Sequence, residues 1–262
     1  MKVFAFSGFL GSEADWTDLA TECRDFQIIP LVPVPAAPVG ADQNGWDAFC
    51  EEFISNQLTR YLNPGEKCFL LGYSLGGRAA ANLVVRHPQF FTGLLALSAH
   101  PGLSSQEERS ARLQQDAKWS MRFHPDSKEP WAQLMTDWDS QSVFASDTKR
   151  LIPVETLELR KRSALQLAHL SLGHQRDLSK DLILSKVPQI WVTGSLDTKF
   201  SGLASQLSTR SNGKILHIAV EGQGHRWPWT MSKNQSKNQS KNDPAQLIHQ
   251  SLLKLKTMGE TT

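Results

Sequence analysis

Short apolar runs alternate with helical patterns along most of the chain. Six of these runs lack strict alternation of apolar and polar positions, which predicts strands buried on both faces of a parallel sheet. They are Val3–Phe6, Ile28–Val32, Cys68–Leu71, Leu94–Leu97, Gln189–Val192 and Ile215–Ile218. Helical patterns lie between or after them, at 13–23, 44–62, 75–87, 199–209 and 244–257. This order predicts an α/β fold with a mostly parallel central sheet flanked by helices.

Residues 104–186 break this alternation. They contain no clear strand and several amphipathic helical patterns, such as those at 107–123 and 155–172. In open α/β sheets, ligands bind at the carboxyl ends of the strands. We therefore expect a core of residues 1–103 and 187–262, with 104–186 inserted as a helical cap over that edge.

A tandem Ser-Lys-Asn-Gln repeat occupies residues 232–242 and contains no apolar side chain. Such a segment cannot bury enough surface to offset the entropy lost on ordering it. We expect a mobile low-complexity loop here.

Composition narrows the classes of partner. The chain of 262 residues suits one α/β domain with an insertion. Its 28 basic and 26 acidic side chains give a net charge of +2. Binding to nucleic acid or to a membrane surface is usually accompanied by a basic excess, so the sequence predicts neither partner. Any attraction for acidic ligands must be local.

The cysteines and the N-terminus bear on location. Cys23, Cys50 and Cys68 are odd in number and lack metal-ligand spacing, which predicts reduced, buried thiols. The apolar N-terminus is interrupted at Gly8 and Gly11 and is too short for a signal peptide. No stretch approaches the ~20 apolar residues that span a bilayer. We expect a soluble, cytoplasmic protein.

Gly72-Tyr73-Ser74-Leu75-Gly76-Gly77 carries the strongest chemical signal. It follows a predicted strand and opens a predicted helix, as a nucleophile elbow does. In such an elbow the serine occupies a strained turn, and glycines two positions away on either side let the backbone pass closely. The alternative is an ordinary glycine-rich turn between a strand and a helix.

An activated serine needs a histidine to take its proton and a carboxylate to orient that histidine. Asp197 and His225 each follow a late predicted strand, in the chain order Ser, Asp, His of an α/β-hydrolase triad. Asp197 could instead cap the helix that begins near residue 199, and His225 could belong to a plain turn. Of the other histidines, His217 suits a packed strand position, and His100 suits a supporting role near the site.

Two backbone amides would complete an oxyanion hole. One normally comes from the residue after the nucleophile and the other from the loop after an early strand. Leu75 and Phe9 occupy these places. The alternative for Phe9 is a glycine-rich turn with no catalytic contact.

Several motifs together are more specific than the triad. They are Gly72–Arg78, His100–Leu103, Glu108–Arg112, Trp119, Arg122-Phe123, Trp138, Val143–Ser146, Asp197–Phe200 and Gly224-His225. In these segments the chain resembles the 2-succinyl-6-hydroxy-2,4-cyclohexadiene-1-carboxylate synthases of the α/β-hydrolase superfamily. The resemblance covers nearly the whole chain apart from the repeat and some loops.

This resemblance implies an α/β-hydrolase fold with a helical cap and no metal or cofactor. It implies a lyase of menaquinone biosynthesis that eliminates pyruvate from 2-succinyl-5-enolpyruvyl-6-hydroxy-3-cyclohexene-1-carboxylate. Ser74, His225 and Asp197 would then act as a base relay that takes a proton from the substrate ring, without forming an acyl-enzyme. The amides of Phe9 and Leu75 would stabilise the developing carboxylate-derived enolate.

The resemblance also implies five substrate-binding residues. They are Tyr73, Arg78, Arg112, Trp138 and Arg160. A polycarboxylate substrate suits this set, because the guanidinium of arginine binds carboxylates in bidentate fashion. Lys161 and Arg162 adjoin Arg160 and leave the register of that match open.

The chain departs from the family pattern in two loops. Ser7-Gly8-Phe9 stands where the family usually has His-Gly-Phe, and Pro33–Gly40 replaces the usual Asp-x-Pro-Gly-His-Gly-x-Ser turn. These changes bear on the substrate more than on the triad. The alternatives are a carboxylesterase or C–C bond hydrolase that uses Ser74 as a covalent nucleophile, and a ligand receptor with a silent triad. The sequence predicts no oligomeric state.

Overall fold

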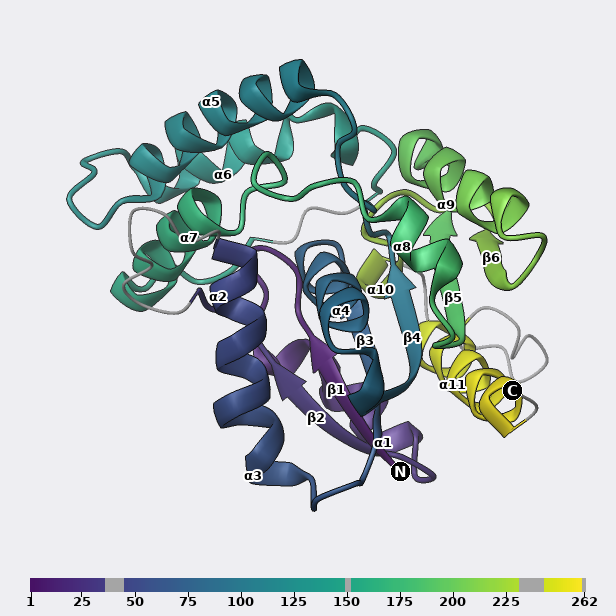
Figure 1. Ribbon diagram of the computed structural model, residues 1–262. Helices are drawn as coiled ribbons and strands as arrows, with labels where there is room; N and C mark the ends of the chain where they lie inside the picture. Colours follow the sequence, from purple (N-terminus) through teal and green to yellow (C-terminus); the bar gives the residue numbers. More distant parts are fainter. Residues whose placement is uncertain (36–44, 149–151, 231–242, 261–262) are drawn as a thin grey trace.

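The protein is described from a computed structural model (Figure 1). The structure describes residues 1–35, 45–148, 152–230 and 243–260. The predicted low-complexity loop at 232–242 lies outside these residues, and so does most of the unusual Pro33–Gly40 turn.

Six strands form the central sheet, in the order β2-β1-β3-β4-β5-β6. All neighbouring strands pair in parallel. The strands are β1 (Lys2–Phe6), β2 (Gln27–Leu31), β3 (Cys68–Tyr73), β4 (Phe91–Leu97), β5 (Gln189–Gly194) and β6 (Ile215–Val220). Each predicted apolar run overlaps one of them, and the predicted α/β fold with a parallel central sheet is confirmed.

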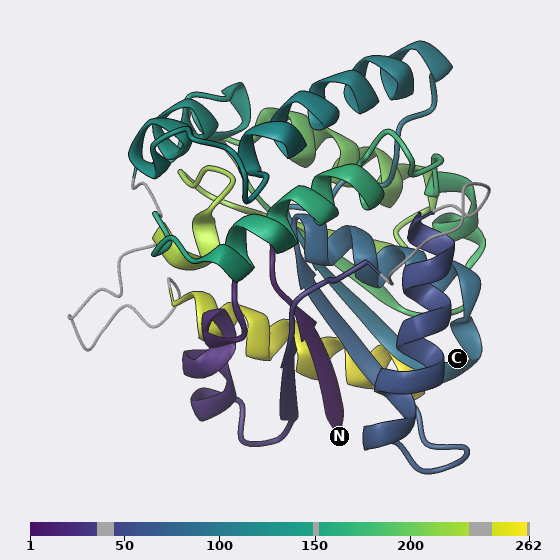
Figure 2. The ribbon, with the colours of Figure 1, turned by 90° about the vertical axis from the view of Figure 1, so that its left-hand side faces the viewer.

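Helices cover both faces of the sheet, with α1 and α11 on one side and α2 and α3 on the other (Figure 2). The first face carries α1 (Thr17–Glu22) and α11 (Pro244–Glu260). The second carries α2 (Gly45–Glu52), α3 (Thr59–Tyr61), α4 (Leu75–Arg86), α8 (Ser179–Leu184) and α9 (Thr198–Arg210). Shorter helical segments are Glu13–Trp16, Pro88–Phe90, Ser142–Phe144 and α10 (Trp227–Thr230).

The predicted helix at 44–62 has an irregular middle. Residues Phe53–Leu58 form π-helical turns between α2 and α3. The apolar pattern places Phe53 and Leu58 in the core, 2% and 3% exposed. A pattern of apolar positions predicts the helix, but it does not distinguish a π turn from an α turn.

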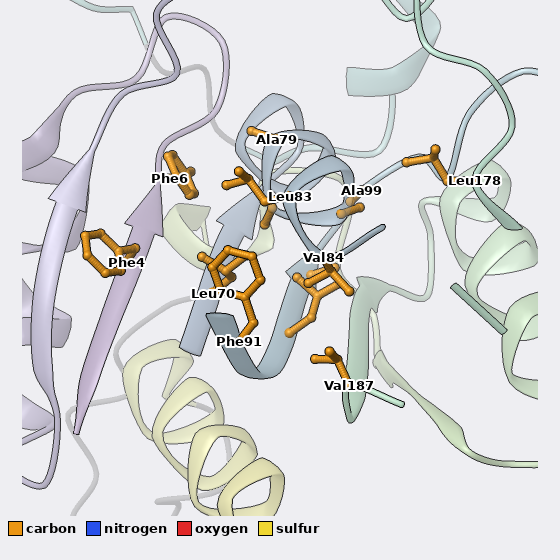
Figure 3. Close-up of a cluster of buried hydrophobic side chains, with 14 of the residues drawn as sticks. Phe4, Phe6, Leu70, Ala79, Leu83, Val84, Phe91, Ala99, Leu178 and Val187 are labelled. Atoms are coloured by element: carbon orange, nitrogen blue, oxygen red, sulfur yellow. The ribbon is translucent and has the colours of Figure 1, made fainter. Parts of the chain in front are cut away.

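The main core lies between the sheet and α4. Phe4 and Phe6 of β1, Leu70 of β3 and Leu83 of α4 are at most 1% exposed, and Figure 3 shows them with Leu178, which lies just before α8. Burying a side chain of this size stabilises a fold by roughly 1.5–3 kcal/mol. This packing fixes α4, and with it the turn at its first residue, against the middle of the sheet.

Three helices between β4 and β5 lie over the carboxyl ends of the strands (Figure 1). They are α5 (Gln106–Phe123), α6 (Trp131–Asp139) and α7 (Leu157–His169). Their buried side chains form a cluster of their own around Phe123 and Trp138. The fourth helix of the predicted cap, α8, packs instead in the main core through Leu178 and Leu182. The division into core and cap stays a prediction. No helix in the described ranges is both long and apolar enough to cross a membrane.

Candidate active site

Ser74 occupies the turn between β3 and α4 in a strained conformation. Its φ of 50° and ψ of −108° are unusual for a residue with a side chain. A Cβ at Gly72 would lie 2.2 Å from the carbonyl oxygen of Gly76, and a Cβ at Gly76 would lie 2.1 Å from that of Phe6. Both glycines are therefore required for the close approach of the backbone. The predicted elbow geometry is present.

Ser74, His225 and Asp197 form a continuous hydrogen-bonded chain. Nε2 of His225 lies 3.2 Å from Oγ of Ser74, and Nδ1 lies 2.6 Å from Oδ2 of Asp197. Asp197 and His225 are 6% and 3% exposed. In this arrangement the carboxylate fixes the imidazole and Nε2 can take the proton of the hydroxyl.

The capping alternative for Asp197 does not describe its side chain. Asp197 is the N-cap residue of α9 by position, yet its side chain makes no capping hydrogen bond. The carboxylate instead bonds to the ring of His225. Asp197 thus lies in the short loop between β5 and α9, and its side chain orients the ring of His225.

The loop after β1 differs chemically from the histidine-containing family pattern. Ser7 is fully buried, and its hydroxyl donates to the carbonyl oxygen of Ser12 at 2.6 Å. A Cβ at Gly8 would lie 2.6 Å from the ring of Tyr73. The hydrogen bond of Ser7 thus fixes the shape of the loop, and the missing side chain of Gly8 lets the loop pack against the elbow. Phe9 and Leu75 both line the cavity described below, so the places of the two candidate amide donors are compatible with the oxyanion hypothesis.

A cavity of about 1440 Å³ lies over the Ser74 hydroxyl. Its lining includes residues that follow the strands, residues of α5, α6 and α7, and the connection after α6 at 141–146. Four of the five predicted substrate-binding residues line it, namely Tyr73, Arg78, Arg112 and Trp138. It exceeds the ~300–1,000 Å³ of ordinary small-molecule sites, so a ring with several carboxylate arms can be accommodated.

Arg78 projects from the first turn of α4 and is partly buried. One Nη donates to the carbonyl oxygen of Leu170 at 3.0 Å, and the guanidinium lies 5.1 Å from the ring centre of Trp46. Burial, together with the nearby Arg112, lowers the pKa of Arg78 to about 9. Since this value is well above neutral, the side chain keeps its charge and can bind an anion.

Arg112 is held in place by an acidic residue one turn along α5. Its Nε donates to both carboxylate oxygens of Asp116, at 2.8 and 2.9 Å. Asp116 is 2% exposed and also accepts a hydrogen bond from Ser171. This pair fixes the direction of the guanidinium. Among the residues that the structure describes, the hydrogen bonds of Arg112 use Nε, so its two Nη groups remain for a ligand.

Trp138 and Tyr73 supply the apolar part of the wall. The ring of Trp138 lies 4.5 Å from that of Phe9, at an interplanar angle of 38°. Tyr73 packs edge to face on Trp229, with 4.4 Å between ring centres, and burial raises the pKa of its hydroxyl. Both residues thus present rigid aromatic surface next to Ser74.

Arg160 is not among the residues that line the cavity, so this placement does not support its predicted role in substrate binding, which stays a prediction. Its guanidinium bonds to Glu155 and to the carbonyl oxygens of Glu129 and Arg122, and it lies over the ring of Trp131. These contacts join α7 to the segment between α5 and α6. Arg160 is therefore a residue of the helical cluster.

Arg162 is the arginine of α7 that lines the cavity. Two residues along an α-helix correspond to a rotation of about 200°, so Arg160 and Arg162 face nearly opposite directions. An Nη of Arg162 donates to the carbonyl oxygen of Gly11 at 2.7 Å. Its Nε is buried and has no hydrogen-bond partner among the described residues. Burial lowers the pKa of Arg162, and Glu158 partly offsets this. In the sequence, the only indication that Arg162 could line the site was its place in the Arg160-Lys161-Arg162 run, which left the register of the match open.

His100 also lines the cavity, in the loop that follows β4. Its Nδ1 accepts a hydrogen bond from the backbone amide of Gly102 at 3.0 Å. Burial, and to a lesser degree the positive charge of Lys199, lowers the pKa of His100 to about 3. The ring is therefore neutral with its proton on Nε2, and it shapes the wall without carrying charge.

The remaining predictions concern the other histidine and the cysteines. His217 lies on β6, and its Nε2 is 2.8 Å from Oγ1 of Thr193 on β5, which fits a packed strand residue. Cys23, Cys50 and Cys68 are buried free thiols, and burial raises the pKa of each to about 12. In the described ranges, no three His, Cys, Asp or Glu residues lie close enough together to hold a metal ion.

Known proteins share this architecture. MenH from S. aureus has a TM-score of 0.72 at 19% identity, covering 99% of this chain and 94% of the other. A thermophilic esterase from Thermogutta terrifontis has a TM-score of 0.64 at 17% identity, covering 97% and 90%. At these identities the likeness shows the fold, which is that of the α/β-hydrolases.

Relatives with higher sequence identity show the family. No family model matches the chain. The 2-succinyl-6-hydroxy-2,4-cyclohexadiene-1-carboxylate synthase of Pectobacterium atrosepticum is 36% identical over 222 residues, covering 82% of this chain and 83% of the relative. The synthase of the same name from Citrobacter koseri is 32% identical over 207 residues, covering 77% and 79%. By these relationships the chain belongs to the 2-succinyl-6-hydroxy-2,4-cyclohexadiene-1-carboxylate synthase family.

Proposed function

We propose that the protein is a lyase that eliminates pyruvate from 2-succinyl-5-enolpyruvyl-6-hydroxy-3-cyclohexene-1-carboxylate, a step of menaquinone biosynthesis. The observation that carries this proposal is the combination of a hydrogen-bonded Ser74–His225–Asp197 chain with a cavity lined by four arginines. They are Arg78, Arg112, Arg162 and Arg226, of which Arg226 is paired with Asp139. The substrate has three carboxylates, and arginine is the side chain best suited to bind them.

The reaction begins with removal of a proton. His225 takes the proton of Ser74, and Oγ of Ser74 takes the proton from ring carbon 2. That carbon is adjacent to the succinyl carbonyl, so the negative charge develops on this ketone oxygen and not on the carboxylate-derived enolate that the resemblance implies. The backbone amides of Phe9 and Leu75 would stabilise this charge, as an oxyanion hole does. Asp197 keeps the imidazole in the required orientation and stabilises its protonated form.

The elimination then moves electrons around the ring. The electron pair of the broken bond to hydrogen forms a double bond between carbons 2 and 3, and the existing double bond moves to carbons 4 and 5. The bond from carbon 5 to oxygen breaks and releases the enolate of pyruvate, which takes the proton held by His225 and becomes pyruvate, so the relay returns to its starting state. Every step uses groups of the chain and the substrate alone.

A covalent hydrolase is the alternative that the same three residues allow. An ester hydrolase would use Ser74 to attack a carbonyl carbon and would need a water molecule for the second step. The arginines that line the cavity favour an anionic substrate over an apolar ester. The partner is accordingly a small polycarboxylate, and a cytoplasmic location stays a prediction from the cysteines.

One assay separates the two reactions. The purified protein is incubated with the enolpyruvyl substrate and, separately, with a short p-nitrophenyl ester, while pyruvate and nitrophenolate are measured. We expect one pyruvate per diene product and little ester turnover. Rapid release of nitrophenolate without pyruvate would reject the lyase and support the hydrolase.

A further inference from the structure

A buried ionic cluster lies directly behind His225. Arg226, which follows His225 in the chain, forms an ion pair with Asp139 at the end of α6, and its Nε lies 3.9 Å from Oδ2 of Asp147. The three side chains are 8%, 4% and 3% exposed. Burying charges is costly unless they are paired. Residues 139–147 begin at the last residue of α6 and pack against the loop that carries His225, and we call them the 139–147 segment.

The peptide group between His225 and Arg226 is held at both ends. Its carbonyl oxygen accepts a hydrogen bond from the hydroxyl of Ser98 at 3.1 Å. Its amide donates to Oδ1 of Asp147 at 2.9 Å. Ser98 directly follows β4, and Asp147 belongs to the 139–147 segment. The backbone of His225 is thus fixed by one group from the sheet and one from the inserted part of the chain.

The 139–147 segment also lies close to the neighbouring residues of the site. A Cβ at Gly224 would lie 2.4 Å from Oδ1 of Asp147 and 2.8 Å from the carbonyl oxygen of Ser146. The hydroxyl of Ser146 donates to the carbonyl oxygen of Leu196, next to Asp197. Glycine at position 224 therefore permits the approach that brings Asp147 within hydrogen-bond distance of the peptide group.

Arg226 anchors the same segment through its side chain. Its guanidinium carbon lies 3.7 Å from the ring centre of Phe144, and the ring of Phe144 lies 5.9 Å from that of His225. Together with the pair to Asp139, this contact fixes the middle and the beginning of the segment, while Asp147 lies at its end. Each of these contacts ties the position of His225 to the 139–147 segment.

We propose that Asp147 is a positioning residue for His225, acting through the peptide group between His225 and Arg226. Asp197 sets the rotation of the imidazole ring, and Asp147 sets the position of the backbone that carries it. The distance from Nε2 to the Ser74 hydroxyl depends on both. The inference rests on the proposed function, because it assigns Asp147 a part in the proton relay.

The first test compares substitutions at Asp147 with one at Asp137. Misplacement of a catalytic group by about 1 Å can cost about 10²-fold in rate, so we expect Asp147→Ala to lower kcat for pyruvate release by about that factor, with a much smaller change in KM. Asp147→Asn keeps an oxygen that accepts the amide hydrogen bond and should restore most of kcat. Asp137→Ala is the matched control. It removes a carboxylate that bonds to Arg122 on the outer side of α6 and should leave kcat unchanged.

A second variant tests the contact without altering Asp147. Gly224→Ala places a methyl group 2.4 Å from Oδ1 of Asp147, which must then move away, so the change should lower kcat in the same manner. Because both changes break one hydrogen bond, the double variant with Asp147→Ala should be no slower than the slower single variant. Additive effects would show that Gly224 acts by another route. If Asp147→Ala does not fold, the comparison of Gly224→Ala with wild type still decides whether the contact matters for kcat.

A substrate-independent measurement separates this inference from the proposed function. The proton on Nδ1 of His225, bonded to Asp197, should give a low-field resonance in the proton NMR spectrum. We expect Asp147→Ala to broaden or shift it and Asp147→Asn and Asp137→Ala to preserve it. Absence of pyruvate release by wild type would reject the proposed function while this signal still tests Asp147. Unchanged kcat and an unchanged resonance in Asp147→Ala would overturn the positioning role.

Discussion

Ser74 and Arg162 line the same cavity, but they are held there in different ways. The conformation of Ser74 follows from its immediate neighbours, since glycines at 72 and 76 allow the strained turn after β3. Arg162 lies on α7, and only the rotation of that helix turns it toward the cavity while Arg160 faces away. Side chains at the sheet edge are therefore specified locally. Those of the inserted helices are specified by packing.

The two regions also pair their charges differently. At the sheet edge, Asp197 and His225 satisfy each other and leave Nε2 directed at Ser74. On the helices, Arg112 forms an ion pair with Asp116 through its Nε, and Arg162 keeps a buried Nε with no partner among the described residues. A buried donor without a partner costs about 1–3 kcal/mol, and a bound carboxylate would remove that cost. The helices are thus suited to bind the anion, and the sheet edge to move the proton.

The largest expected effect is at the sheet edge. Ser74→Ala removes the group that contacts the substrate proton, and we expect kcat to fall by several orders of magnitude, toward the ~10⁶-fold seen when a triad serine is removed. Substrate binding should persist, because the arginines are untouched. Rate measurements and equilibrium binding of the substrate check this. A nearly normal rate would remove Ser74 from the mechanism.

The second effect separates the two arginines of α7. Arg162→Ala should lower kcat/KM by about 10–100-fold, the value of one or two charged hydrogen bonds at ~1.5–3 kcal/mol. Arg160→Ala should leave kcat/KM unchanged and lower the melting temperature, because two carbonyl oxygens lose their donor. Kinetics and thermal unfolding of both variants give the comparison. A loss of kcat/KM in Arg160→Ala but not in Arg162→Ala would instead support Arg160 as the substrate-binding residue, as the family resemblance implies.

The smallest effect concerns Arg112 and its partner. Arg112→Ala should lower kcat/KM about tenfold, less than Arg162→Ala, because Asp116 already offsets part of its charge. The sequence alone gives no reason to expect a loss of stability, yet the change leaves the buried Asp116 carboxylate without its cation. We therefore expect a lower melting temperature, which Asp116→Asn should restore in the double variant without restoring kcat/KM. Equal stability of wild type and Arg112→Ala would contradict this role for the pair.

Much of the fold follows from local pattern. Strands buried on both faces are continuous apolar runs, so all six were predictable, and the helices between them followed from spacing. The predicted ends of the strands were less accurate than their positions in the chain. β3 continues to Tyr73 because Gly72 and Tyr73 pair with Ala96 and Leu97 of β4, and pairing with a neighbouring strand leaves no mark on hydrophobic periodicity.

The site divides in the same way. Ser74, Asp197 and His225 could be predicted because each lies in the turn or loop after a strand, and the carboxyl ends of parallel strands meet at one edge. Arg162 and Asp147 could not be assigned in this manner. Their roles depend on how α7 and the 139–147 segment pack on residues more than 70 positions away, such as Gly11 and Arg226.

The amino-acid sequence by itself determined the parallel α/β sheet, the elbow at Ser74 and the order of its two partners, because these features depend on short segments with strong local preferences. The tertiary structure decided which arginines face the cavity and what holds His225 in place. The composition of a helix does not decide which of its faces turns toward the rest of the protein. That rotation about the helix axis is selected only by packing against the neighbouring elements. For that reason Arg162 lines the cavity and Arg160 joins the helices.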